Sequence, residues 1–445
     1  MRLLLLALLC AAPAFAGRPF TPEELLATRR LDDPQVSPDG KQVAFTVRQK
    51  SLELNRDVKD VWLQPLAGGP ARQFTRDGRS EHPRWSPDGK QLLVVSQRAG
   101  QDQAQLWLYD LADGGDPRQV TSLFFGADAG VWSPDGRWIA YTSEVYPGCA
   151  GDTAAVDACD RKRFEERKAS KVEARIVDHL FARHWTEWKD GKRTHVFVQP
   201  AQGGPARDLT PGDSDWPTFR LGGGDDIGFT PDGAQVLVSA KPAQREAWST
   251  NGDLWAIPVQ GGAPRNLTAG NPGDDASPKP SPDGRWLAWL AQARNGYESD
   301  QWKLMLMDRR SGMVSVIGDF GDDVSLEGKV ARYADSPASS DFALAPDGSG
   351  GPQGAWEDEW GMRWNEAAFA ARGYVVLAVN PRGSTGYGRA FEEQISRDWG
   401  GLAYDDLMRA VDAAEKLPGV LPGRTCGARA SSRGSSTFPT RATGC

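Results

Sequence analysis

"SPDGKQLLVVS", at residues 86–96, couples a tight turn to a run of strand-forming residues. In the turn, Pro87 presets the backbone, Asp88 can bond back to it, and Gly89 can take the positive φ that closes a hairpin. The apolar and β-branched residues that follow are typical of a half-buried β-strand. The stretch therefore predicts a β-hairpin.

The same turn recurs along the first three-quarters of the 445-residue chain, and a second motif alternates with it. The turn occurs as SPDG, TPDG or APDG at 37–40, 86–89, 133–136, 230–233, 281–284 and 345–348. The second motif is "GGPARQFT" at 68–75, with related versions at 114–121, 203–210 and 261–268. Most turns lie about 50 residues apart, which with four strands per unit is typical of a β-propeller.

One interval, from 133 to 230, is 97 residues long. We interpret it as two periods with one turn lost, near the charged stretch 161–194, where Val172, Ile176 and Leu180 predict one face of a helix. The sequence thus predicts an all-β propeller of about seven blades over residues 17–348, with its last blade incomplete. The alternative is an open sandwich of unrelated hairpins, which the fixed order of the two motifs disfavours.

The N-terminus has the pattern of a secretion signal over residues 1–16. Arg2 precedes a short apolar run, and Ala14-Phe15-Ala16 fits a cleavage site that would leave Gly17 first. We therefore expect export to the periplasm or the extracellular space. No later segment is long and apolar enough to predict a membrane span.

The composition indicates which classes of partner and cofactor to expect. A net charge of -7 and a pI near 5.4 argue against nucleic acid. Export permits disulfides, and Cys149 and Cys159 share one loop that a bridge could close, which we favour over two free thiols. Because no CxxC pair or Cys/His cluster is present, we expect no metal and no cofactor. The sequence does not predict the oligomeric state.

The pattern changes after residue 350. Residues 357–373 predict a helix, 374–380 ("YVVLAVN") a strand buried on both faces, 381–388 ("PRGSTGYG") a loop, and 402–417 a second amphipathic helix. A strand, a loop and a helix in this order predict the start of an α/β domain, which we assign to residues 349–420.

These motifs carry a resemblance to a known family. A propeller with SPDG turns, followed by "GGPQGAW", "NPRGSTGYG" and "DWGG…YDDLMRAVDAA", resembles the prolyl oligopeptidase family of serine peptidases, and in particular its secreted dipeptidyl-peptidase V-like and acylaminoacyl-peptidase-like branches. The similarity runs from about residue 20 to about residue 420. It implies an α/β-hydrolase domain with a Ser–Asp–His triad, capped by a propeller that admits short peptides.

The resemblance also assigns candidate residues. Gly350 and Gly351 match the family's oxyanion-side loop, although Ser349 stands where the family has His. Some dipeptidyl peptidases of the family hold the substrate amine with propeller carboxylates, which makes Glu165 and Glu166 candidates; a solvated helix face is the simpler interpretation, and the one we favour. We expect Arg382 to be structural and to bond nearby backbone or carboxylates.

Two parts of the family pattern are missing from the sequence. The strand that leads into the Gly-Gly-Pro loop is absent, because Ser349 directly follows the last turn, and we infer a loss near 325–350; a rapidly evolved loop is the alternative. Past residue 420 the family has a G-x-S-x-G elbow. Here Ser432 lies in the nearest match, "ASSRG", which we interpret as a chance match in a Ser-rich tail over 421–445.

All four histidines, His82, His179, His184 and His195, precede residue 196, so no triad in the order Ser–Asp–His can be assembled. The composition of 421–445 suggests a shifted reading frame. We expect an exported serine exopeptidase by descent that is inactive as this chain. A non-catalytic propeller that binds peptide or protein is the alternative.

Overall fold

The computed structural model describes most of residues 20–317 and parts of residues 354–416. The described ranges are 20–112, 116–149, 151–177, 180, 182–184, 187–218, 227–241, 246–317, 354–356, 365–371, 376–414 and 416. The predicted signal at 1–16, the last turn at 345–348 and the tail at 421–445 lie outside them.

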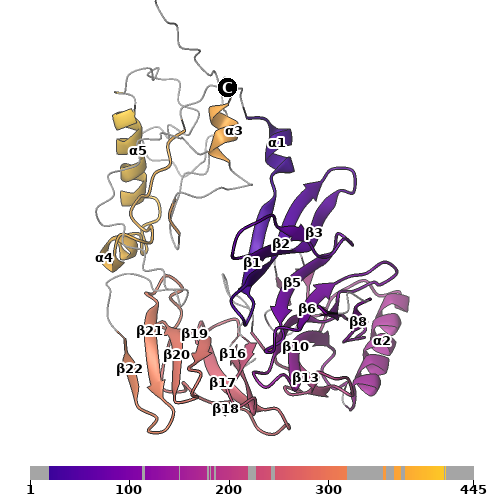
Figure 1. Ribbon diagram of the computed structural model, residues 1–445. Coiled ribbons are helices and arrows are strands. Elements are labelled where there is room, and N and C mark those ends of the chain that lie inside the picture. Colours follow the sequence, from indigo (N-terminus) through magenta and orange to yellow (C-terminus); the bar gives the residue numbers. More distant parts are fainter. Residues whose placement is uncertain are drawn as a thin grey trace, which may run out of the picture.

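Five four-stranded antiparallel sheets follow one another along the chain, after a short helix α1 (Pro22–Ala27). The first has β1 (Arg30–Val36), β2 (Gln42–Ser51), β3 (Arg56–Pro65) and β4 (Arg72–Gln73), and the second has β5 (Ser80–Trp85), β6 (Gln91–Ser96), β7 (Gln105–Asp110) and β8 (Arg118–Gln119). The third has β9 (Asp128–Trp132), β10 (Trp138–Val145), β13 (Arg193–Pro200) and β14 (Arg207–Asp208). The fourth has β15 (Ile227–Phe229), β16 (Gln235–Ala240), β17 (Asp253–Pro258) and β18 (Arg265–Asn266), and the fifth has β19 (Asp275–Pro280), β20 (Trp286–Ala291), β21 (Lys303–Asp308) and β22 (Val314–Val316). This succession of blade-like sheets is a β-propeller (Figure 1).

The recurring turn is held by its own side chains. Ser37 Oγ accepts the N–H of Gln42 at 2.9 Å and donates to Asp39 Oδ1 at 2.7 Å, while the N–H of Gly40 donates to Ser37 O at 2.9 Å. Gly40 has φ +68°, a conformation that favours glycine. The same bonds recur at the turns beginning at 86, 133, 230 and 281. The five predicted hairpins in the described residues are therefore confirmed.

The final Thr of the second motif joins the third and fourth strands of a sheet. Thr75 Oγ1 accepts the N–H of Val61 and donates to Asp60 Oδ1, both at 2.9 Å. The same hydroxyl position accepts the equivalent strand N–H at Thr121, Thr210 and Thr268. The Thr hydroxyl thereby gives a buried N–H of the third strand a hydrogen-bond partner where the short fourth strand ends. This explains why Thr is the last residue of the motif.

Apolar side chains fill the space between consecutive sheets. Ala44 and Leu63 of the first sheet pack against Leu92 and Val94 of the second, and similar clusters lie between the second and third, third and fourth, and fourth and fifth sheets. The substantial contacts between sheets join each sheet to the next along the chain.

The interpretation of the 97-residue interval was wrong. β10 and β13 pair directly, from Trp138↔Pro200 to Val145↔Arg193, so they are neighbouring strands of one sheet. The interval holds a single blade with an insertion over residues 146–192, which joins these two strands. No turn was lost; the extra residues extend the loop at one end of the third sheet.

The insertion carries helix α2 (Thr153–Ala169) and a two-residue hairpin of β11 (Arg183–His184) and β12 (Glu187–Trp188). The helix predicted on Val172, Ile176 and Leu180 is also wrong. α2 ends at Ala169, its C-cap Ser170 has an extended ψ of 135°, and Ile176 is 97% exposed. Apolar spacing in a charged segment was not enough to predict a helix there, because these side chains have no core to face.

The C-terminal segment contains α3 (Glu366–Ala370), α4 (Arg389–Glu393) and α5 (Leu402–Ala414). α5 confirms the second predicted helix, and α3 lies inside the first. Of the strand predicted at 374–380, the described residues show a β-bridge at the buried Val376 and no strand over 377–380. In Figure 1 this segment (orange to yellow) lies above the fifth sheet.

Candidate active-site region

The loop after the Gly-Gly-Pro motif is bonded to the loop at 380–388. Asn380 Oδ1 accepts the N–H of Trp356 at 2.7 Å, and Asn380 Nδ2 donates to Trp356 O at 2.9 Å and to Tyr387 Oη at 2.8 Å. The N–H of Thr385 donates to Gly354 O at 3.1 Å. Gly350 and Gly351 themselves lie outside the described residues. The sequence analysis used both motifs but did not predict that Asn380 joins them.

Arg382 holds this second loop against α5. Its Nε donates to Asp406 Oδ2 and its Nη2 to Asp406 Oδ1, each at 2.7 Å, and its backbone N–H also donates to Asp406 Oδ2 at 3.1 Å. Hydrogen bonds from Arg382 hold the pKa of Asp406 below its usual value. The structural role predicted for Arg382 is confirmed.

The propeller contacts this segment through the loop between β20 and β21. Arg294 Nη2 donates to Glu393 Oε1 of α4 at 2.7 Å, and Arg294 Nε donates to Asp300 Oδ1 at 2.8 Å. Arg389 of α4 also donates to Glu393 Oε1, at 2.8 Å. The buried Asp300 thus orients Arg294 toward α4, and α4 directly follows the loop that carries Tyr387 and Asn380.

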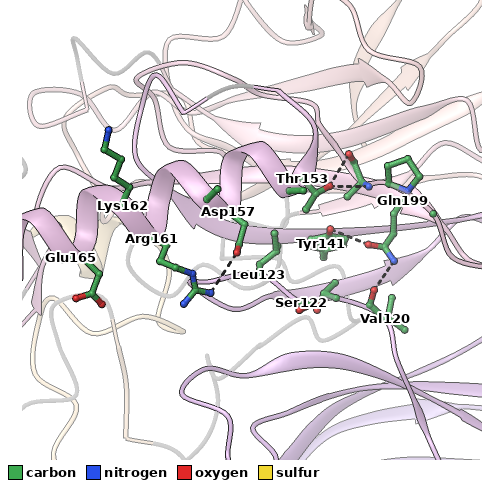
Figure 2. Close-up of a pocket in the computed structure, with 16 residues that line it drawn as sticks. Val120, Ser122, Leu123, Tyr141, Thr153, Asp157, Arg161, Lys162, Glu165 and Gln199 are labelled. Atoms are coloured by element: carbon green, nitrogen blue, oxygen red, sulfur yellow. Dashed lines mark hydrogen bonds and ion pairs between the residues drawn. The ribbon is translucent and has the colours of Figure 1, made fainter.

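Glu165 and Glu166 both lie on α2, in the insertion of the third sheet. Glu166 forms an exposed ion pair with Lys162 at 3.9 Å. Glu165 lies at the rim of a groove of about 630 Å³ between α2 and the third sheet, which Figure 2 shows. Inside the groove Tyr141 Oη donates to Gln199 Oε1 at 3.1 Å.

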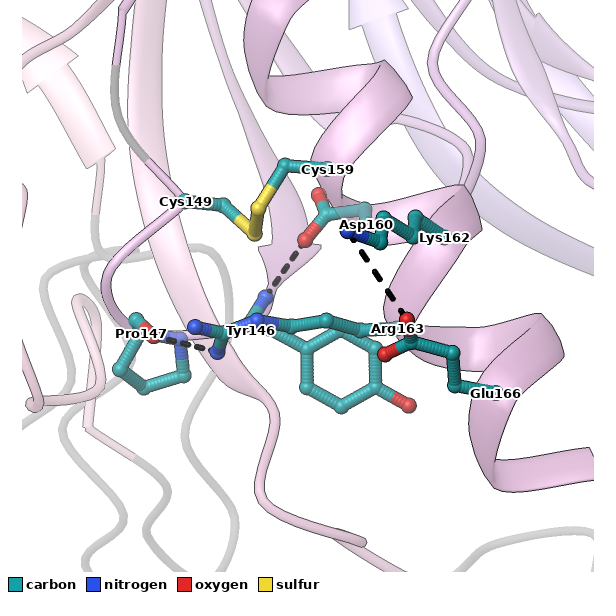
Figure 3. The surroundings of a disulfide bond; sticks show 8 residues. All are labelled: Tyr146, Pro147, Cys149, Cys159, Asp160, Lys162, Arg163 and Glu166. Atoms are coloured by element: carbon teal, nitrogen blue, oxygen red, sulfur yellow. Dashed lines mark hydrogen bonds and ion pairs between the residues drawn. A yellow bond between two sulfur atoms is a disulfide. The ribbon is translucent and has the colours of Figure 1, made fainter. Parts of the chain in front are cut away.

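A disulfide and buried polar contacts fix α2. Cys149 and Cys159 are joined, with Cα atoms 5.6 Å apart (Figure 3). Beside the bridge, Asp160 Oδ1 accepts the N–H of Tyr146 at 2.8 Å. Burial raises the pKa of Asp160 to about 6. The position of the candidate carboxylates is therefore set by covalent and buried contacts at the start of the insertion.

A buried ionic network fixes the other end of the insertion. Lys189 contacts Asp215 and donates to Glu246 Oε1 at 3.2 Å, and Arg193 Nη1 donates to Asp215 Oδ2 at 3.2 Å. Arg193 Nε also donates to the exposed Asp213 at 2.6 Å. These contacts tie the insertion to the loop between β16 and β17 in the fourth sheet. No sequence pattern predicts this pairing, because its members lie far apart in the chain.

The two histidines with described side chains are both paired with aspartates of the propeller. His195 is buried, and its Nδ1 lies 2.7 Å from Asp208 Oδ2 while its Nε2 lies 2.9 Å from Gly212 O. His82 Nδ1 lies 3.2 Å from Asp128 Oδ1. Both ring nitrogens of His195 are thus engaged. The His184 side chain, His179 and Ser432 lie outside the described residues.

Among the described residues, no group of three or more His, Cys, Asp or Glu side chains could hold a metal ion. No helix in the described ranges is long and apolar enough to cross a bilayer.

The fold and these loops define a β-propeller joined to a segment of an α/β-hydrolase domain. The model of the prolyl oligopeptidase family matches residues 360–435. This confirms the resemblance to that family found in the sequence. The match extends past residue 420 and includes Ser432, in the stretch predicted to lie outside the family.

Curated relatives and solved structures are also similar to this chain. Dipeptidyl-peptidase 5 of Porphyromonas endodontalis is 26% identical over 519 residues, covering 90% of this chain and 73% of that protein. The protein of the same name from Porphyromonas gingivalis is 25% identical, covering 95% and 76%. An acylaminoacyl peptidase bound to Z-Gly-Gly-Phe-chloromethyl ketone has a TM-score of 0.65 at 16% identity, covering 89% of this chain and 72% of that chain. The Pyrococcus horikoshii acylaminoacyl peptidase gives a TM-score of 0.62, also at 16% identity, covering 90% and 73%. Both structures support the fold.

The alignment to the first relative spans 519 positions, more than the 445 residues of this chain, so that relative has residues between matched segments that have no counterpart here.

Proposed function

We propose that this chain is the propeller-bearing part of an exported serine peptidase that acts on the N-terminal end of short peptides, as a dipeptidyl aminopeptidase or an acylaminoacyl peptidase. The observation that carries the proposal is the clamp between Asn380 and Trp356. It joins the segment after the Gly-Gly-Pro motif to the loop at 380–388, and a propeller that only binds a partner has no use for such a clamp.

In this chemistry a serine attacks the peptide carbonyl, a histidine takes its proton, and backbone N–H groups stabilise the oxyanion. Gly350 and Gly351 are the candidates for the oxyanion side. Asn380 then acts as a positioning residue, because its side chain fixes both the N–H and the C=O of Trp356, a few residues downstream. Arg382 and Asp406 support the same loop from α5.

If propeller carboxylates hold the substrate amine, rather than forming only a solvated helix face, Glu165 and Glu166 are the candidates. Their carboxylates lie on a helix fixed by a disulfide, in an insertion between the second and third strands of its sheet. The β20–β21 loop, which contacts α4, joins the same pair of strands in its own sheet. In a catalytically active form, Glu165→Gln should raise KM for free-amine substrates while leaving acylated substrates unaffected. Glu53→Gln, in the β2–β3 loop, is the matched control.

We further propose that these 445 residues do not themselves hydrolyse peptides. The engagement of both His195 nitrogens supports this, because a general base needs a nitrogen free to take the proton from serine. The competing function is a propeller that binds peptide or protein without catalysis.

A fluorophosphonate probe separates these functions, because it labels only an activated serine. We expect no labelling of this chain, and labelling of any longer product of the same gene isolated from its native host. If a longer product with a complete G-x-S-x-G elbow stays unlabelled, the peptidase proposal fails and the binding function is favoured. Translating the neighbouring reading frames tests the shifted-frame hypothesis: without an apolar strand, an elbow and a later His in any frame, that hypothesis is wrong.

A further inference from the structure

Packing between the sheets follows one register, counted from the glycine of each turn. In the second, third and fourth sheets, the third and fifth residues after this glycine face the preceding sheet. These residues are Leu92 and Val94, Ile139 and Tyr141, and Val236 and Val238. The fourth residue, and in the second sheet also the sixth, faces the following sheet: Leu93 and Val95, Ala140, and Leu237. Each of these sheets therefore has one apolar face for the sheet before it and another for the sheet after it.

Among the described residues the first sheet has no preceding sheet, yet its outward face carries apolar side chains. Ala44 is buried against the second sheet, whereas Val43 and Phe45, at the third and fifth positions, are only half-buried. On the same face Val36 pairs with Val43 and Leu31 pairs with Val47 across the ladder. Leu31 is 69% exposed and Val36 is 59% exposed.

The fifth sheet has no following sheet among the described residues, and its outward face is also apolar. Leu287 and Trp289 are buried against the fourth sheet. Ala288 and Leu290, at the fourth and sixth positions, are half-buried, and they lie opposite Leu306 and Leu304 of β21. By contrast, β6 and β16 are buried on both faces.

We propose that the fifth sheet of one copy of this chain packs on the first sheet of a second copy, head to tail. The two faces are the matching halves of the contact that the chain already makes four times between its own consecutive sheets. They are also apolar, and burial of apolar area drives such packing. The partner surface is therefore another blade of the same kind, with apolar side chains at the same positions after its turn glycine.

We infer a second copy as the occupant because the first and fifth sheets of one chain do not pack on each other in the described residues. No substantial contact joins the first and fifth sheets in the described part of the chain, and Figure 1 shows them as the first and last members of the series. The sequence at 325–348 is also poor in strand-forming residues. A head-to-tail contact uses two different surfaces, so it continues into rings or open chains rather than stopping at a dimer. This inference does not depend on the proposed peptidase function.

Sedimentation velocity of the purified chain over a range of micromolar concentrations tests the proposal. We expect species of two or more chains whose population grows with concentration. Leu31→Glu, on the outward face of the first sheet, and Leu290→Glu, on that of the fifth, should each give monomers. Leu66→Glu, in the exposed turn after β3, should associate like the unmodified chain.

Mixing the two variants gives the decisive result. A Leu31→Glu copy keeps an intact fifth sheet and a Leu290→Glu copy keeps an intact first sheet, so their mixture should form a 1:1 dimer and nothing larger. Because this result requires both variants to be folded, it separates a blocked interface from misfolding. A monomeric unmodified chain, association that survives both substitutions, or a mixture that stays monomeric overturns the proposal. Closure by the chain's own residues would give the first of these results.

Discussion

Replacing Thr121 by Val should destabilise the propeller, because its hydroxyl closes the contact between the third and fourth strands of the second sheet. Thr121 Oγ1 accepts the N–H of Leu106 at 2.9 Å and donates to Gln105 Oε1 at 2.8 Å, and all three residues are buried. Valine keeps the shape and removes both bonds. Gln105 Oε1 retains the N–H of Leu123 at 3.2 Å, but the N–H of Leu106 loses its partner.

An unpaired buried donor costs about 1–3 kcal/mol, so we expect Thr121→Val to lower the free energy of unfolding by about 2 kcal/mol. Thr46→Val is the matched control, for which we expect a change in the free energy of unfolding of the opposite sign. Thr46 is 1% exposed and its hydroxyl has no hydrogen-bond partner. Removing a buried unpaired hydroxyl should raise the free energy of unfolding by about 1 kcal/mol.

Urea unfolding followed by tryptophan fluorescence measures both changes. The midpoint should fall for Thr121→Val and rise for Thr46→Val, with similar slopes if the unfolded states are alike. If the two substitutions shift the midpoint in the same direction by similar amounts, the hydroxyl of the second motif does not have the role described here.

Three further predictions follow from the contacts described above. Mass measurement of the purified protein should find Cys149 and Cys159 oxidised, and Cys159→Ala should cost about 2–3 kcal/mol; alkylation of both thiols without reduction would count against the bridge. Burial raises the pKa of Asp275 to about 7 and that of Asp160 to about 6, so the folded chain holds these protons more tightly than the unfolded chain. The free energy of unfolding should therefore fall as the pH rises from about 5 through 7, and Asp275→Asn should flatten this slope; an unchanged slope would refute the assignment. Glu393→Gln should speed hydrogen exchange in α4 and leave the propeller unchanged, while Glu298→Gln, elsewhere on the β20–β21 loop, should have no effect; because the Arg294–Glu393 pair is partly exposed, we expect a change of about 0.5–1 kcal/mol.

The turns and hairpins could be predicted from sequence because each is decided locally. Ser, Pro, Asp and Gly at fixed spacing make their own hydrogen bonds within six residues, as at Ser37 and Gln42. The 97-residue interval was misinterpreted for a related reason. Spacing between turns cannot distinguish a lost turn from an insertion, since the pairing of Val145 with Arg193 is non-local.

The candidate site was predicted only in part. The motifs at 350–356 and 380–388 could be recognised, and the bonding of Arg382 to a carboxylate was predicted, but the clamp made by Asn380 could not. A side chain that forms hydrogen bonds with the backbone of a loop distant in sequence leaves no repeating pattern from which the contact could be predicted. The same holds for Arg294, whose partner Glu393 lies 99 residues further along the chain.

The measurement that most directly tests the central claim is hydrolysis of dipeptidyl and aminoacyl chromogenic substrates by the purified chain, beside its Ser432→Ala variant. Ser432 occupies the nucleophile position of "ASSRG", the nearest match to the expected elbow, and the family match includes it. Loss of triad members in a serine peptidase costs several orders of magnitude in rate. We predict no turnover above the uncatalysed rate for either protein. Steady turnover by the unmodified chain that disappears in Ser432→Ala would contradict the account, because it would show that these residues assemble a working nucleophile.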